Sequence, residues 1–370
     1  MVKFILAVAL SLALSQERAP IVQSVDLSVP FPPSVFTQDG RLSIAYELHL
    51  TNFQQVDITL NRLRLTSNGA AIAAFSGDEL QRLIVRPGFR NDYATPRILG
   101  PGQRAIVNLW LQLPPGVGAT AIAQTIETDV MQPSGAVRAE VTQTVTAPPW
   151  QPLVIGSPLG AGRWVAIYDP LLKGGHRTAV YTLDGRARIP GRFAIDFIQM
   201  PPSGALNLKQ SPRPADMNGF GADVLAVADG RIAAALDDTA DDLPTPVPPE
   251  RGSGNYISLD LGGGRFAFYE HLQQGSLRVK TGDQVKKGQV IGRLGSSGST
   301  SIGPHLHFHV ADANSLLSAE GVPFAFEHYA VFGAFASINA LTSGEPWLPG
   351  EVVRPHLTTR PSPNVVLSFR

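Results

Sequence analysis

Gly303–Val310, with the sequence GPHLHFHV, carries three histidines at alternate positions and follows a loop rich in glycine and serine. Side chains alternate between the two faces of a β-strand, so His305, His307 and His309 should share one face, while the apolar residues between them face a core. Neighbouring histidines on that face would be about 6.5–7 Å apart at the backbone, close enough for two of them to serve one metal ion. A solvated polar face would not need such a concentration of one residue type. The stretch therefore predicts a strand that carries a metal site.

The residues upstream also predict strands. Ser253–Leu261 and Phe266–Leu272 follow a strand pattern and are separated by three glycines, which indicates a β-hairpin with its tip at residues 262–264. His271 should then lie at the far end of the return strand. Val279–Gly292 predicts two further short strands joined by a turn.

Five segments together resemble, in order and approximate spacing, the catalytic domain of the lysostaphin-type (LytM) zinc metallopeptidases, which cut peptide cross-links in peptidoglycan. These segments are Asp223–Ile232, Gly254–Tyr256, Tyr269–Leu272, Thr281–Gly292 and Gly303–Phe308. The resemblance covers about Arg188 to Val310. It implies a LytM-type domain, an all-β sheet or barrel, at residues 153–332, with one Zn²⁺ ion as cofactor and peptidoglycan peptides as substrate.

The resemblance also implies roles for individual residues. Asp196 and His307 would be zinc ligands, and His271 and His305 would be the catalytic pair. Zinc would polarise the scissile carbonyl and acidify a water, His305 would accept the proton as general base, and His271 would stabilise the oxyanion. His309 is expected to be a wall of the pocket or a neighbour of the ligands. Glu270, which immediately precedes His271, is expected on the opposite face.

One position departs from the pattern of this family. Residues 192–196 read RFAID, so Arg192 stands where the family has its first zinc-ligand histidine. A guanidinium stays cationic and has no lone pair for a metal, so Arg192 cannot replace that ligand. Either the site has lost its metal, or another residue completes it.

His176 is the candidate for the missing ligand. Residues 178–183 and 188–195 should form the arms of a hairpin that turns at Asp184-Gly185, which is a strong two-residue turn signal. Opposed residues across this turn have numbers that sum to about 369, which sets His176 beside Phe193. The alternative is a surface histidine in the loop 173–177, because one residue of slip in the register reverses the face.

The first half of the chain predicts a second all-β unit. From Ile21 to about Thr146, apolar and polar residues alternate in short runs broken by glycine, proline and asparagine. This pattern predicts an immunoglobulin-like β-sandwich at residues 20–148. The proline-rich stretch APPWQP at 147–152 is the expected domain boundary. The strand pattern weakens beyond about Gly333, so residues 333–370 are expected to form a C-terminal tail without activity.

The N-terminus predicts export. Residues 1–15 combine Lys3, an apolar run of about 11 residues and a small-residue cleavage signal, which is typical of a secretory signal peptide. Such a run is too short for a membrane span, which takes about 20 residues. No later stretch predicts a transmembrane segment. The mature protein is therefore expected to be secreted or periplasmic, in the cell envelope.

Composition excludes several classes of function. The chain has 30 basic and 30 acidic residues, so it lacks the charge excess typical of nucleic-acid binding. It has no cysteine, which excludes disulfides, thiolate ligands and a cysteine nucleophile. Any metal must therefore be held by histidine and carboxylate.

Three functions remain. The first is an exported zinc-dependent peptidoglycan hydrolase, an endopeptidase, which is favoured by the retention of Asp196, His271, His305 and His307. The second is a catalytically degenerate LytM-domain protein that binds or activates another cell-wall hydrolase, which is favoured by Arg192. The third is a sugar-binding lectin, for which nothing outside the fold speaks.

Overall fold

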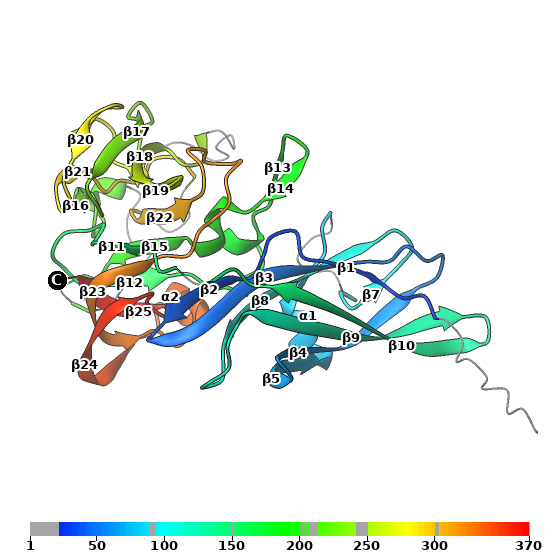
Figure 1. The fold of residues 1–370 in the computed structure, drawn as a ribbon. Helices are drawn as coiled ribbons and strands as arrows, with labels where there is room; N and C mark the ends of the chain where they lie inside the picture. The colour runs from blue at the N-terminus through cyan, green and yellow to red at the C-terminus, as the bar shows by residue number, and fades with distance from the viewer. Residues whose placement is uncertain are drawn as a thin grey trace, which may run out of the picture.

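A computed structural model describes residues 22–88, 94–149, 151–201, 203–204, 206, 213–241, 251–299 and 303–369. The segment expected to be a signal peptide, residues 1–15, lies outside these ranges. The described chain is nearly all β, as predicted, and its strands form two bodies of sheet (Figure 1). Within the described ranges, no helix combines the length and the apolar character that a membrane crossing requires.

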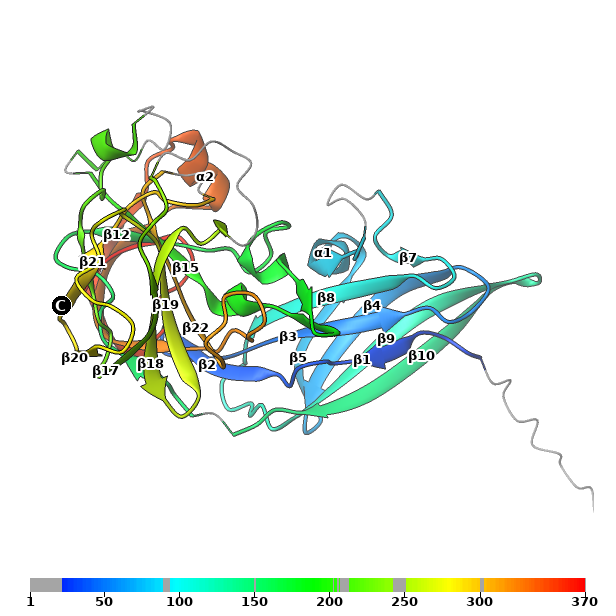
Figure 2. The ribbon, with the colours of Figure 1, turned by 90° about the horizontal axis from the view of Figure 1, so that it is seen from above.

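The first body, which we call the sandwich, consists of two five-stranded antiparallel sheets (Figure 2). One sheet contains β1 (Asp26–Ser28), β2 (Ser34–Gln38), β3 (Arg41–Thr51), β6 (Ile84–Val85) and β8 (Arg104–Gln112). The other contains β4 (Ile58–Ser67), β5 (Ala70–Ser76), β7 (Ile98–Leu99), β9 (Ala121–Gln132) and β10 (Gly135–Thr146). A short helix, α1 (Gly77–Leu83), connects β5 to β6.

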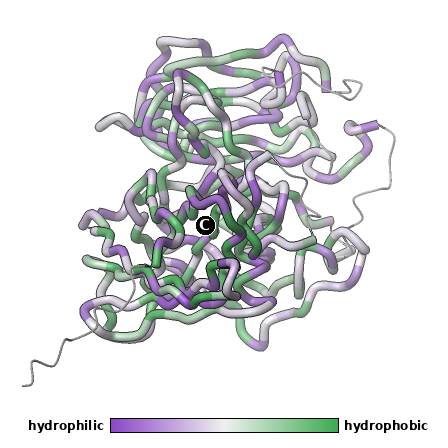
Figure 3. The backbone as a smooth tube through the Cα atoms, turned by 90° about the vertical axis from the view of Figure 1, so that its right-hand side faces the viewer, coloured by the Kyte–Doolittle hydropathy of each residue, from purple (hydrophilic) through white to green (hydrophobic). Residues whose placement is uncertain are grey.

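Alternation along the strands builds the core of the sandwich. Ile44, Leu48 and Leu50 of β3 are fully buried and belong to one apolar cluster with residues of the opposite sheet, such as Leu63 and Ile126. Hydrophobic and hydrophilic residues alternate along many strands in Figure 3, as the period of two requires. A β-sandwich is therefore present, and its assignment to the immunoglobulin type stays a prediction.

The second body, which we call the large sheet, has eleven strands. Along its main path the order is β11 (Val154–Ile155), β23 (Ala325–Ala334), β25 (Val365–Phe369), β12 (Trp164–Ile167), β15 (Ile195–Gln199), β22 (Leu306–Ala311), β19 (Arg265–Leu272), β18 (Asn255–Gly262), β17 (Gly230–Leu236) and β20 (Gln284–Val285), and β24 (Leu348–Thr359) pairs with β23. The predicted hairpin at residues 253–272 is thus confirmed as β18 and β19.

Smaller elements surround the large sheet. They are the two-stranded sheets of β13 (Tyr181–Leu183) with β14 (Arg186–Arg188) and of β16 (Asp223–Leu225) with β21 (Val290–Arg293), the 3-10 helices η1 (His176–Thr178), η2 (Pro190–Phe193) and η3 (Pro214–Asp216), and the helix α2 (Ile338–Ser343). The helices η1 and η2 contact each other, and η2 also contacts β22.

Residues 333–369, which the sequence suggested to be a tail, supply two strands of the large sheet. β25 lies between β23 and β12, and its Val366 and Leu367 are fully buried. β24 contains Pro349 and Pro355, which have no N–H to donate to a strand ladder. The expectation of a tail is corrected here, because a short buried strand and a proline-containing strand leave only a weak periodic signal.

The sandwich and the large sheet share a buried junction. Phe36 of β2 and Ala45 of β3 belong to the same apolar cluster as Phe193 and Tyr168, which lie beyond the proline-rich stretch at 147–152. Trp110 of β8 packs against Phe193, with 5.4 Å between the ring centroids. The sandwich therefore buries part of its surface beside η2 and next to the strands that carry the site.

Candidate metal and catalytic site

Three neighbouring strands bring the polar residues of the site together. β22 lies between β15 and β19, and His307 is the register partner of Asp196 on one side and of Glu270 on the other. Leu306, Phe308 and Val310 are fully buried in the core, as the alternation in the sequence predicted. Side chains at opposed positions of adjacent strands share a face, so Asp196, His307 and Glu270 lie on the face away from that core.

His176, Asp196 and His307 form a compact group. His307 Nδ1 lies 2.9 Å from Asp196 Oδ1, and His176 Nε2 lies 3.2 Å from Asp196 Oδ2. The rings of His176 and His307 are nearly perpendicular, with 4.5 Å between their centroids. One donor atom from each of the three residues lies within 4.8 Å of the other two. Two imidazole nitrogens and one carboxylate oxygen are the three protein ligands typical of catalytic zinc, so these residues fit a Zn²⁺ ion.

The hairpin that was expected to deliver His176 is present, but it ends early. β13 and β14 pair Tyr181 with Arg188 and Thr182 with Ala187, which is the predicted register. Both arms then leave the strand conformation as η1 and η2. A side chain at Gly191 would meet Cβ of His176 at 3.2 Å, so His176 lies against Gly191 rather than beside Phe193. The contact therefore lies two residues from the approximate position expected, because helical turns replaced the strands.

Arg192 takes no part in this group. Its side chain is buried, and its Nη2 lies 2.9 Å from Oε2 of Glu47, a residue of β3 in the sandwich. Its Nη1 donates to Glu320 Oε2. The guanidinium charge is therefore matched by two carboxylates outside the group of His176, Asp196 and His307.

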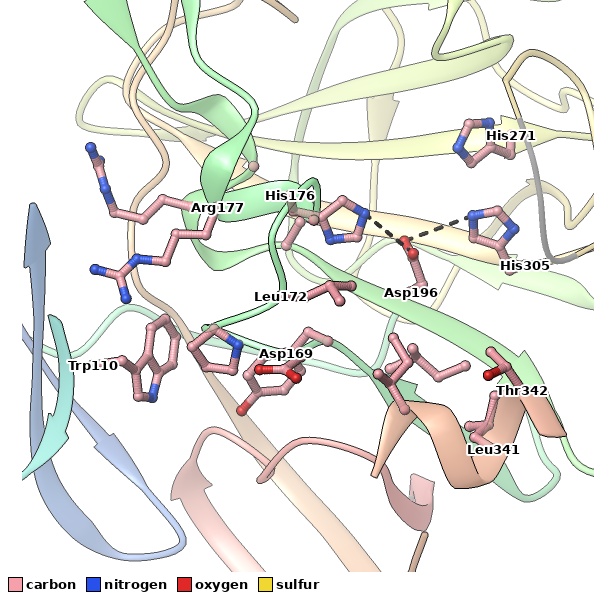
Figure 4. A pocket seen from close by; sticks show the side chains of 18 of the residues that line it. Trp110, Asp169, Leu172, His176, Arg177, Asp196, His271, His305, Leu341 and Thr342 are labelled. Carbon is pink, nitrogen blue, oxygen red and sulfur yellow. Dashed lines mark ion pairs between the residues drawn. The ribbon is translucent and has the colours of Figure 1, made fainter. Parts of the chain in front are cut away.

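His271 and His305 stand side by side at the edge of the group, with 4.6 Å between their ring centroids. Figure 4 shows Asp196 between His176 and His305, with His271 next to His305. His305 Nδ1 lies 2.8 Å from the carbonyl of Gly303, and His271 Nδ1 lies 2.8 Å from the carbonyl of Ser297. A carbonyl only accepts, so each neutral ring carries its proton on Nδ1 and offers Nε2 as a proton acceptor.

His271 adopts a left-handed backbone conformation, with φ of 62°. This conformation is uncommon for a residue other than glycine, and it breaks the regular alternation at the end of β19. Glu270, the register partner of His307, lies on the same side as the histidines, with its Oε1 3.2 Å from His309 Nδ1 and 3.7 Å from His307 Nε2. The expectation that Glu270 faces away from the site was therefore wrong.

The charges of these buried groups depend on one another. Burial alone would raise the pKa of Asp196, but His176 and His305 hold that pKa well below its usual range. Burial alone would lower the pKa of His307, but Glu270 and Asp196 raise it to about 9. Burial and the neighbouring His305 lower the pKa of His271 to about 3. In metal-free protein at neutral pH, His307 is therefore cationic and His271 is neutral.

Zinc must displace the proton of His307, which predicts a pH dependence. Below about pH 9 the metal-free protein holds that proton, so zinc affinity should rise by up to about tenfold per pH unit from pH 7 to 9 and level off above it. Chelator competition at a series of pH values, on protein first stripped of metal, measures this slope. An affinity that stays constant between pH 7 and 9 would contradict the displacement of this proton.

A cavity of about 240 Å³ opens at the site. Its walls include His176, Asp196, His271 and His305, and the sandwich contributes Trp110 (Figure 4). The cavity gives a small substrate segment access to the proposed ligands and to both catalytic candidates.

Sequence reasoning did not find Glu47 or the closeness of Glu270 to His307. Glu47 precedes Arg177 by 130 positions, and no local pattern relates the two. No local signal marked Glu47, because it falls at the same alternate positions of β3 as Ser43 and His49.

Part of the chain is similar to known proteins. Residues 215–318 match the model of peptidase family M23. A stretch of 56 residues is 45% identical to a peptidoglycan DD-endopeptidase, ShyC, of Vibrio cholerae, and covers 15% of this chain and 12% of that protein. A stretch of 145 residues is 31% identical to the glycyl-glycine endopeptidase ALE-1 of Staphylococcus capitis, and covers 36% of each protein. The matches thus span 12% of the first relative and 36% of the second.

Two solved structures are also similar. The catalytic domain of lysostaphin from Staphylococcus simulans is 25% identical, covers 44% of this chain and 88% of that chain, and gives a TM-score of 0.25. A zinc containing peptidase from Vibrio cholerae is 16% identical, covers 78% of this chain and 83% of that chain, and gives a TM-score of 0.26. On the strength of the family match, which includes His271, His305 and His307, residues 215–318 form a domain of peptidase family M23.

Proposed function

We propose that this protein is an exported zinc-dependent endopeptidase that cuts peptide cross-links of peptidoglycan in the cell envelope. The observation that carries the proposal is the grouping of His176, Asp196 and His307. His176 and Asp196 line one cavity together with His271 and His305. The family match supports hydrolysis of a peptide bond. The names of the relatives, a peptidoglycan DD-endopeptidase and a glycyl-glycine endopeptidase, support the substrate class.

His176 Nε2, Asp196 and His307 Nδ1 would hold one zinc ion. When bound, Zn²⁺ supplies a Lewis acid that polarises the scissile carbonyl and acidifies water. Glu270 contributes a second negative charge close to His307, and such a carboxylate behind a ligand histidine fixes the orientation of its ring. Asp196 and Glu270 together balance the charge of one divalent ion.

His305 is the proposed general base. Its Nδ1–H is held by the carbonyl of Gly303, and its Nε2 faces Asp196 Oδ1 at 3.7 Å. Nε2 can accept the proton of the attacking water and then deliver it to the nitrogen of the leaving amine. His271 offers the same tautomer beside it, and its low pKa keeps the ring neutral, so its Nε2 accepts a hydrogen bond rather than donating one.

The alternative function, a degenerate LytM-domain protein that binds or activates another cell-wall hydrolase, was favoured by Arg192. With His176 beside Asp196 and His307, three candidate zinc ligands are present although Arg192 cannot bind a metal. Arg192 is then no longer a reason to prefer the regulator. We therefore prefer the enzyme. The sugar-binding alternative gains no support from the described residues.

Digestion of peptidoglycan tests the proposal. The zinc-loaded protein is incubated with purified peptidoglycan, one preparation with direct cross-links and one with glycine bridges, and the fragments are analysed by mass spectrometry. We expect new amino and carboxyl ends within the cross-links of at least one preparation, and none with His305→Ala protein under the same conditions. If the zinc-loaded protein releases neither kind of end, the endopeptidase proposal is wrong.

A further inference from the structure

We infer that the sandwich is a constituent of the metal site, because Glu47 of β3 positions His176 through Arg177. Glu47 is then a positioning residue that acts on a ligand from another part of the chain. This inference rests on the zinc site of the proposed function and adds to it a role for the first half of the chain.

Glu47 is buried between Arg177 and Arg192, which lie beyond the proline-rich stretch at 147–152. It is 3% exposed, and it accepts hydrogen bonds from Arg177 Nε at 3.1 Å and Arg177 Nη2 at 3.0 Å. It also accepts from Arg192 Nε at 3.1 Å. Burial alone would raise the pKa of Glu47, but Arg192 and Arg177 lower it, so the carboxylate stays ionised. Multiple charge-assisted bonds to a buried carboxylate fix geometry better than a single neutral bond.

Arg177 anchors η1 to the sandwich by further bonds. Its Nη2 donates to the backbone carbonyls of Tyr46 at 2.9 Å and of Leu109 at 2.7 Å, in β3 and β8. Its side chain is 2% exposed, and it extends away from Asp196 in Figure 4. The anchor therefore comprises one carboxylate and two carbonyls of the sandwich.

His176 is the residue next to this anchor. η1 has three residues and follows Gly174 and Gly175, so it has little rigidity of its own. By contrast, Asp196 and His307 lie on paired strands of the large sheet, whose ladder holds them in place. Of the three proposed ligands, His176 is thus the one whose position depends on the bonds of Arg177.

Arg192 connects Glu47 to η2, the 3-10 helix that packs against His176. η2 packs against η1, and Gly191, the neighbour of Arg192, lies against Cβ of His176. Glu47 therefore ties both 3-10 helices to one point of β3. The arginine that stands at the position of the family's first ligand is the residue that makes this connection, since it binds Glu47 and Glu320 at once.

A double-variant cycle distinguishes two roles of Glu47: positioning His176, or only joining the sandwich to the large sheet. Zinc dissociation constants are measured by chelator competition on the full chain for the wild type, Glu47→Gln, His176→Ala and the double variant. We expect Glu47→Gln to weaken zinc binding about 10- to 100-fold. In the His176→Ala background the same change should alter the constant by less than about threefold, because the residue on which Glu47 acts is gone. The visible spectrum of Co²⁺-loaded Glu47→Gln protein should also shift toward that of His176→Ala.

A matched control variant is Arg86→Gln. Arg86 is a buried arginine of the sandwich that donates to the carbonyl of Arg104 and to Gln103. We expect this change to lower thermal stability and to leave the zinc dissociation constant unchanged. If Glu47→Gln does not fold by circular dichroism, Arg177→Gln replaces it in the cycle, since that change keeps the pair of Glu47 with Arg192.

Each outcome decides the inference. Wild-type zinc affinity in folded Glu47→Gln protein, or an equal loss with and without His176, would show that Glu47 only joins the two halves. A wild-type chain that takes up no zinc would overturn the proposed zinc site, and this inference with it. A loss that disappears in the His176→Ala background is the result we expect.

Discussion

Replacing His307 by alanine is expected to reduce the zinc content from near one equivalent per chain to background. His307 provides one of two imidazoles in the proposed ligand set, and the chain has no cysteine to take its place. A carboxylate and one remaining imidazole are too few protein ligands for a stable zinc site. The change also leaves Asp196 and Glu270 without the cation that lies between them in metal-free protein. Elemental analysis after dialysis against zinc-free buffer measures the effect.

A control is needed because His307 is buried among charged groups. His328 of β23 is an exposed histidine that does not belong to the metal group, so His328→Ala protein should keep its zinc. Circular dichroism of both variants verifies that they fold. His307→Ala protein with the zinc content of the wild type would remove His307 from the ligand set.

Replacing His305 by alanine should have a different effect, in which zinc remains and turnover falls by about 10² to 10⁴. His305 lies outside the group of donor atoms that fit one ion, and its Nδ1 is occupied by the carbonyl of Gly303. The loss should therefore fall on proton transfer. Measured on a cross-link peptide, kcat should fall while KM changes little.

The variant His305→Gln provides the matched comparison. Glutamine keeps polar atoms at this position but does not act as a base near neutral pH, so it should lose as much turnover as alanine. If zinc and turnover disappear together in both variants, His305 is a ligand rather than the general base.

Local patterns explain why much of the fold could be predicted. The alternation in Leu306–Val310 predicted both the strand β22 and its buried face, since a period of two is a property of the strand itself. The Asp184-Gly185 signal predicted the turn and register of β13 and β14, because a two-residue turn determines which residues are opposed. These features depend on residues close together in the sequence.

Other features depend on distant parts of the chain and could not be predicted. The contact of Glu47 with Arg177 joins residues 130 positions apart, and the place of β25 between β23 and β12 depends on the whole sheet. Glu270 and His271 share one side because His271 has a left-handed backbone, whereas the alternation rule assumes an extended one. For His176 the predicted register gave a position near Arg192. The observed contact is with Gly191 rather than Phe193, since η1 and η2 replaced the expected strands.

The central claim is that His176 completes the zinc site in place of the position held by Arg192. Anomalous diffraction at the zinc absorption edge, from crystals of the zinc-loaded full chain, tests it most directly. The account predicts a single strong peak with His176 Nε2, Asp196 and His307 Nδ1 each about 2.0–2.2 Å away. A peak that is bound by Asp196 and His307 but has His176 outside coordination distance, or the absence of any peak at these residues, would contradict it.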